Sequence, residues 1–185
     1  MLVHKIQKQP RRPVASCWRC GLAALLAGVG LALAAGPAQA AWTAAIKKDP
    51  LTRESRCLLL SDTQTISDGY EQTPVSLVFN GASLLVVTGS ELDGSFADLQ
   101  LVVNDEPPLH SNKITPNKMI LNFDQNVPDL LQRLREGRQA TVYLRFWPTW
   151  PATQAYPVSF SLIGFSKAHD AFNQGCRSVG PSSAG

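Results

Sequence analysis

Short apolar runs separated by turn-forming residues constrain the fold of this chain more than any other feature. Seven runs, each five or six residues long, are rich in β-branched and aromatic residues. This length and composition suit β-strands better than helices. The predicted strands are Cys57–Ser61, Val75–Phe79, Leu84–Thr88, Asp98–Val103, Lys118–Phe123, Thr141–Phe146 and Val158–Ile163.

The segments between these runs carry residues that favour turns. Glycine accepts a positive φ and proline fixes φ, so pairs that contain them interrupt a strand. One segment, Asn80–Ser83, predicts a four-residue loop that closes a β-hairpin. About seven strands at this spacing predict a mainly β fold, either an antiparallel β-sandwich or a flattened barrel. The turn pairs are Asp68-Gly69, Asn80-Gly81, Asp93-Gly94 and Pro107-Pro108.

Two segments predict short helices. In Asn126–Gly137, Pro128 and Asp129 suit a first turn, three leucines form an apolar stripe, and the glycine ends the helix. In Ser166–Gly175, the serine can cap the N-terminus and the glycine can end the helix just before Cys176. We expect one β-sandwich domain over residues 41–176 and a disordered tail over residues 177–185.

The first forty residues have the layout of a Sec-type signal peptide. A basic region precedes the apolar run Gly21–Ala35, and Gly36-Pro37 ends that run. Small residues at Ala38 and Ala40 predict cleavage before Ala41. The alternative is an uncleaved anchor over residues 17–40, whose length approaches the ~20 residues needed to span a bilayer. Cleavage predicts a periplasmic protein with no stable membrane insertion, and the alternative predicts attachment to the inner membrane.

The charge distribution excludes a general nucleic-acid binder. The chain has a formal net charge of +3, but five of its 17 basic residues lie before position 41 with no acidic residue among them. The segment after position 40 therefore holds 12 basic and 14 acidic residues, a formal net charge of −2. Such a balance supplies no global basic field for nucleic acid.

Two cysteines, Cys57 and Cys176, follow the predicted cleavage site. An even number of cysteines in an exported chain favours a disulfide, which would join the start of the domain to its end. Two free buried thiols are the alternative.

Several motifs together resemble the invasion-associated locus B family. They are an opening Trp42, the Cys-Leu-x-Leu-Ser strand of Cys57–Ser61, Arg135-Glu136-Gly137 after a leucine-rich helix, and the closing Ser-Leu-x-Gly-Phe-x-x-Ala of Ser161–Ala168. The resemblance covers Trp42 to about Cys176. It implies an exported β-sandwich of the periplasm or envelope without known catalysis.

Few residues predict enzymatic chemistry, and we expect no cofactor and no metal. His110 and His169 lack metal-ligand spacing, and Asp62, Asp68 and Glu71 lack the spacing of a calcium loop. An envelope enzyme that acts on carbohydrate stays open as an alternative. Such an enzyme would pair carboxylates that are distant in sequence, namely Glu91 or Asp93 with Asp105 or Glu106.

The segment Arg145–Tyr156 contains the strongest binding signal. Trp147, Trp150 and Tyr156 gather in a predicted proline-bearing loop, where they can bind a protein or glycan of the cell envelope. The alternative is that both tryptophans fold back and cover the end of the sandwich. A local basic patch beside the loop is a further hypothesis, and a solvated helix and strand face is its alternative. The patch would comprise Arg133, Arg135, Arg138 and Arg145.

The function predicted from these observations is that of a non-enzymatic, exported interaction module. The carbohydrate-acting enzyme is one alternative. A membrane-anchored structural subunit is the other, if the first forty residues are not removed.

Overall fold

Ten strands and two short helices form the part of the chain that the structure, a computed structural model, describes. That part comprises residues 41–150 and 154–176. The strands make two antiparallel sheets, and neither sheet closes into a barrel within these residues. The prediction of a mainly β fold is confirmed, in its sandwich form. The predicted signal peptide and the predicted disordered tail lie outside the described residues.

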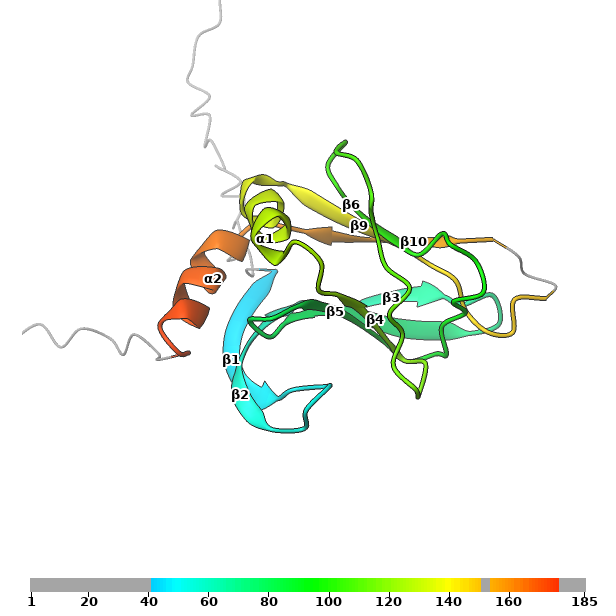
Figure 1. Ribbon diagram of the computed structural model, residues 1–185, viewed down its shortest axis with the longest axis horizontal. Coiled ribbons are helices and arrows are strands. Elements are labelled where there is room, and N and C mark those ends of the chain that lie inside the picture. Colours follow the sequence, from blue (N-terminus) through cyan, green and yellow to red (C-terminus); the bar gives the residue numbers. More distant parts are fainter. Residues whose placement is uncertain (1–40, 151–153, 177–185) are drawn as a thin grey trace, which may run out of the picture. The chain divides into compact units, whose positions relative to one another are not determined.

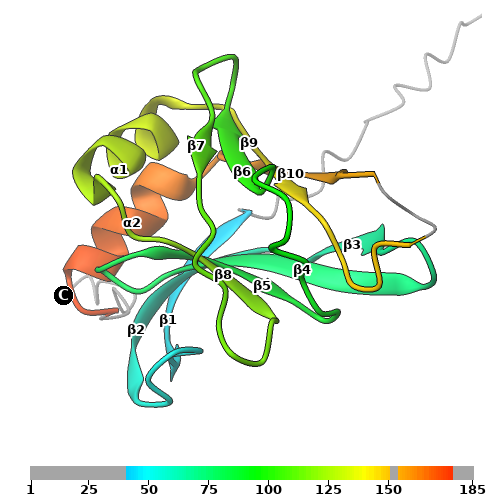
Figure 2. The same cartoon turned by 45° about the vertical axis from the view of Figure 1, so that its right-hand side comes forward.

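The larger sheet has the strand order β1-β2-β4-β5-β8, and β3 pairs with β4 beside this path. The smaller sheet has the order β10-β9-β6-β7 (Figures 1 and 2; β7 is labelled in Figure 2). The larger sheet consists of β1 Trp42–Lys48, β2 Ser55–Ser61, β3 Gln64–Ser67, β4 Gln72–Phe79, β5 Leu84–Thr88 and β8 Ile120–Phe123. The smaller sheet consists of β6 Gln100–Val103, β7 Leu109–His110, β9 Gln139–Leu144 and β10 Tyr156–Ser161.

The main hydrophobic core fills the space between the two sheets. In β9, Ala140, Val142 and Leu144 are buried while the residues between them are partly exposed, which is the period-two pattern of a strand with one buried face. In β10, Val158 and Phe160 alternate in the same way with exposed residues. This alternation places these two strands two residues earlier than the sequence runs predict.

The predicted hairpin is confirmed. Phe79 pairs with Leu84, so Asn80–Ser83 forms the four-residue loop. The side-chain oxygen of Asn80 accepts hydrogen bonds from the backbone N–H groups of Ala82 and Ser83, both at 3.0 Å. This local bonding explains why the loop forms at this asparagine.

Three strands were missed by the sequence analysis. β3 is mostly polar, β7 has two residues, and β1 lacks apolar alternation. Each depends on a neighbour: β1 pairs with β2 along its whole length, from Trp42 with Ser61 to Lys48 with Ser55. Pairing with a partner strand, rather than local propensity, stabilises such strands.

The helix α1 (Val127–Glu136) agrees with the sequence analysis. Its buried residues are Leu130 and Leu134, and the helix ends at Gly137. A Cβ atom at Gly137 would lie 2.6 Å from Cγ1 of Val103 and 2.8 Å from the carbonyl oxygen of Arg133. Close packing therefore requires glycine at this position.

The second helix, α2 (Phe165–Asn173), begins one residue before the predicted cap. Ser166 lies inside the helix, and its hydroxyl donates to the carbonyl oxygen of Arg135 at 3.1 Å instead of capping. Gly164, with φ of 89°, reverses the chain in front of the helix. The predicted serine cap is therefore wrong, because the Gly164 turn and the burial of Phe165 set the start of the helix.

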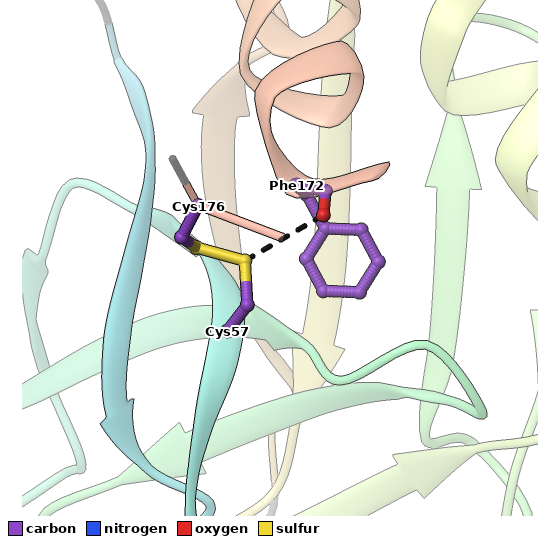
Figure 3. The surroundings of a disulfide bond; sticks show 3 residues. All are labelled: Cys57, Phe172 and Cys176. Carbon is purple, nitrogen blue, oxygen red and sulfur yellow. Dashed lines mark hydrogen bonds between the residues drawn. A yellow bond between two sulfur atoms is a disulfide. The ribbon is translucent and has the colours of Figure 1, made fainter. Parts of the chain in front are cut away.

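Both helices lie at one end of the sandwich, near the place where β1 enters the larger sheet (Figures 1 and 2). There Cys57 of β2 and Cys176 after α2 form a disulfide, with their Cα atoms 5.5 Å apart (Figure 3). Trp42 packs edge-on against Phe165 at 4.8 Å between ring centroids and donates its indole N–H to the carbonyl oxygen of Ser161. The disulfide that the cysteine count favours thus fixes α2 to the larger sheet.

Candidate interaction surface

The segment after β9 exposes two tryptophans at the end of the sandwich opposite the helices. Trp147 is 56% exposed and Trp150 is 79% exposed. The alternative in which both rings fold back over the core does not occur. Both indoles therefore present apolar surface to the surroundings.

Thr149 anchors the backbone between these tryptophans. Its side chain is buried, and its hydroxyl donates a hydrogen bond to the carboxylate of Asp93. The N–H of Trp147 donates to the carbonyl oxygen of Glu91 at 2.8 Å. The loop is therefore attached to the segment that follows β5, and its position does not depend on the two exposed rings.

Asp93 stays ionised in this position. Burial alone would raise the pKa of its carboxyl group, but hydrogen bonds from Thr149 and Ser95, with the positive charge of Arg145, lower that pKa below its ordinary value. The ionised carboxylate is the stronger acceptor for the hydroxyl of Thr149.

Tyr70 holds the loop from the other side. Its hydroxyl donates to the carbonyl oxygen of Trp150 at 2.7 Å and approaches that of Pro148 at 3.3 Å. The tyrosine ring is itself 56% exposed. Tyr70, Trp147 and Trp150 therefore form one surface, which we call the aromatic surface. Tyr70 was not among the predicted site residues, although its position directly after the Asp68-Gly69 turn could have indicated an exposed aromatic side chain.

Two hollows adjoin Trp147. One, of about 450 Å³, is lined by residues that include Asp93, Ile114, Lys118 and Trp147. The other, of about 310 Å³, is lined by residues that include Asp68, Tyr70, Glu91 and Trp147. The ammonium group of Lys118 lies 5.5 Å from the centroid of the Trp147 ring and 3.7 Å from the carboxylate of Glu91. Charged groups thus surround the exposed indole.

Tyr156 does not belong to this surface. It is the first residue of β10, where it pairs with Leu144, and it is half-buried against Phe146 with ring centroids 5.9 Å apart. Its assignment to the loop is wrong, because the alternation of buried Val158 and Phe160 extends the strand back to this residue.

Arg145 is also not part of an exposed basic patch. It is 8% exposed, pairs with the carboxylate of Asp98, and lies 4.2 Å from the centroid of the Phe96 ring. A buried positive charge needs a group of opposite charge nearby, and the carboxylate of Asp98 is such a group.

The other arginines of the predicted patch lie at the helix end of the sandwich. Arg133 pairs with Asp129 and Glu106, and Arg135 pairs with Asp170. Arg138 directly precedes β9, whereas Arg145 directly follows it. The strand separates them, so the four arginines do not form one patch beside the loop.

The carboxylates that the carbohydrate-acting enzyme would pair do not lie close together. The N–H of Asp93 bonds the carbonyl oxygen of Arg145, while the N–H of Asn104, next to Asp105, bonds that of Gln139. The six residue steps from Gln139 to Arg145 span about 20 Å of extended chain. Glycosidases hold their carboxyl pair about 5–10 Å apart. Asp105 and Glu106 thus lie at the opposite end of β9 from Glu91 and Asp93.

The two histidines have different surroundings. His110 is exposed in β7. His169 is buried, stacks between Phe165 and Phe172, and accepts a hydrogen bond at Nδ1 from Arg135 at 2.7 Å. Burial and the charge of Arg135 lower the pKa of His169, although Asp170 opposes this shift. Within residues 41–150 and 154–176, no cluster of three or more His, Cys, Asp or Glu side chains could hold a metal ion.

No helix in the described part of the chain is long and apolar enough to cross a membrane.

Fold and site together define a disulfide-linked, two-sheet β protein with an exposed aromatic surface at one end. No protein-family model and no curated protein matches the chain. Among solved structures, the chain is similar to the crystal structure of invasion associated protein b from Bartonella henselae. The alignment has a TM-score of 0.47 and 16% sequence identity, and it covers 73% of this chain and 93% of that one. Membership of the invasion-associated locus B family stays a prediction.

Proposed function

We propose that this chain is an exported interaction module that binds a protein partner of the cell envelope through Tyr70, Trp147 and Trp150. The observation that carries the proposal is the exposure of two tryptophans in a loop whose backbone is fixed from both sides. Thr149 bonds Asp93 on one side, and Tyr70 bonds the carbonyl oxygen of Trp150 on the other. A loop whose backbone is already fixed loses little conformational entropy on binding.

The composition of the surface supports a protein as the partner. Tryptophan and tyrosine dominate the binding energy of protein interfaces, and such interfaces have an apolar centre with a polar rim. Here Trp147 and Trp150 supply the centre, while Glu71, Glu91 and Lys118 supply charged groups around it. Exposed aromatic surface otherwise costs solubility.

Export is the second part of the proposal. The Cys57–Cys176 disulfide fits an oxidising compartment, where such bonds persist. The layout of residues 1–40 supports passage to the periplasm, with residues 41–176 as the working domain. The intact mass of protein from the envelope fraction tests this part, because a soluble product should begin at Ala41. Recovery of the full-length chain from the membrane fraction would instead favour the anchored subunit.

Cross-linking in the producing cells tests the interaction. The wild type is compared with a Trp147→Ala/Trp150→Ala variant and with an Ile46→Ala/Ile163→Ala control. The control removes two apolar side chains that are 64% and 75% exposed and lie outside the aromatic surface. The wild type and the control should capture the same discrete protein, the tryptophan variant should lose it, and the purified partner should bind the wild type directly.

Two outcomes would overturn the proposal. Equal capture by the tryptophan variant would remove the aromatic surface from the interaction. Binding to isolated envelope glycan, with no protein captured, would replace the protein partner with a carbohydrate ligand.

A further inference from the structure

We infer that the hollow between Tyr70 and Trp147 receives an arginine side chain of the partner. This inference rests on the proposed function and specifies the chemistry of what binds. The hollow has a volume of about 310 Å³, at the low end of the range of about 300–1,000 Å³ for ligand pockets. A single long side chain, rather than a large ligand, suits this volume.

The charge of the hollow is negative. Its lining includes the carboxylates of Asp68, Glu71 and Glu91 and contains no lysine, arginine or histidine among the described residues. Lys118, which lines the neighbouring hollow, lies 3.7 Å from Glu91 and offsets one of the three charges. A net negative charge stays on the side of Asp68 and Glu71, and it attracts a cation.

Asp68 is fixed as a negative charge in the lining of this hollow. The residue is buried, and one oxygen accepts the backbone N–H groups of Tyr70 and Glu71 at 2.9 and 2.8 Å. The other accepts the hydroxyl of Ser90 at 2.6 Å. Burial alone would raise the pKa of Asp68, but these hydrogen bonds lower it, so the carboxylate stays charged.

The rings at this end of the molecule already accept cations from within the chain. Lys118 lies 5.5 Å from the centroid of the Trp147 ring, and the guanidinium of Arg145 lies 4.2 Å from that of Phe96. Trp147 also lines the hollow that contains Asp68, to which Lys118 does not contribute. We place the cation of the partner on the part of the indole that lines this hollow.

Arginine fits this combination better than lysine. A planar guanidinium stacks on an aromatic ring and at the same time donates forked hydrogen bonds to a carboxylate at the ring edge. The pairing of Arg145 with Phe96 and Asp98 provides an example within this protein. In the hollow, Trp147 would supply the ring, and Glu71 or Glu91 the carboxylate.

A titration of the ¹⁵N-labelled protein tests the inference. The probes are two short peptides that differ in one residue, arginine or its neutral isostere citrulline. The readout is the indole N–H signals of Trp147 and Trp150, assigned with Trp→Phe variants. We expect the arginine peptide to bind about tenfold more tightly than the citrulline peptide. Its affinity should fall as salt is added.

The acidic side chains are tested with matched variants. The Glu71→Gln/Glu91→Gln variant should bind the arginine peptide about tenfold more weakly than the wild type. The control variant Glu54→Gln/Glu136→Gln removes the same charge elsewhere and should bind it as tightly as the wild type. Equal binding of both peptides would overturn the inference while leaving an aromatic interaction intact. The absence of any shift with the arginine peptide would overturn it as well. The proposed function fails separately, when the tryptophan variant still captures the partner.

Discussion

The hydroxyl of Tyr70 donates a hydrogen bond of 2.7 Å to the carbonyl oxygen of Trp150, 80 residues later in the chain. This bond joins the turn after β3 to the segment after β9, and therefore one sheet to the other. It leaves both aromatic rings exposed, because it uses only the hydroxyl and a backbone oxygen. The aromatic surface is thus fixed without being covered.

Loss of that hydroxyl should loosen the loop without unfolding the protein. We expect Tyr70→Phe to cost at most about 1 kcal/mol of unfolding free energy, because the bond is solvent-exposed. Amide hydrogen exchange in residues 147–150 should nevertheless become faster, and partner capture should fall. Tyr143→Phe is the control, since no hydrogen bond of the Tyr143 hydroxyl occurs within the described residues. Unchanged exchange in the Tyr70 variant would show that other contacts hold the loop.

Among the polar residues, Asp49 should be one whose replacement lowers the unfolding free energy most. It is fully buried, accepts the N–H of Leu51 at 2.8 Å, and accepts the side-chain amide of Asn80 at 3.1 Å. Asp49→Ala would leave these donors unsatisfied, and we expect a loss of about 2–4 kcal/mol in urea unfolding. Asp124→Ala, which breaks the exposed pair with Lys113, should cost less than about 1 kcal/mol. Equal losses in both variants would contradict this reading of Asp49.

Removal of the disulfide should destabilise the domain strongly. The bond closes a loop of 119 residues, and the chain-entropy model gives about 4–5 kcal/mol for such a closure. Urea unfolding of Cys57→Ser/Cys176→Ser should show this loss, and reduction of the wild type should reproduce it. A loss under about 1 kcal/mol would mean that α2 is held by its packing alone.

Stability should fall as the pH drops below about 6.5, the ordinary pKa of histidine. The pKa of His169 is lowered in the folded protein, so the unfolded chain takes up the proton first. The contribution of His169 to the unfolding free energy is therefore complete above its pKa in the unfolded chain. It is lost as the pH falls toward its pKa in the folded protein.

Urea midpoints at about pH 7.5 and about pH 5 measure this effect, above the range in which aspartates titrate. His169→Gln should be less stable at both values but should lose less on acidification. A His110→Gln control retains His169 and should retain the wild-type difference. If His169→Gln loses as much stability between the two pH values as the wild type, another group is responsible.

The sequence by itself determined the local features of this protein. Short apolar runs predicted seven of the ten described strands, the Asn80–Ser83 loop was set by its own hydrogen bonds, and α1 lies within the predicted helical segment. The cysteine count favoured the disulfide, and clustered tryptophans singled out the segment after β9, while its exposure was decided only by the structure. Each of these signals depends on neighbouring residues or on composition, which a single sequence displays.

Only the tertiary structure decided which distant groups meet. It buried Arg145 against Asp98 and Phe96, placed Tyr156 in a strand, and brought Tyr70 to Trp150. It also separated Asp93 from Glu106, because β9 lies between them. Sheet pairing and the burial of charge set these relationships, and both act between residues that no local pattern connects.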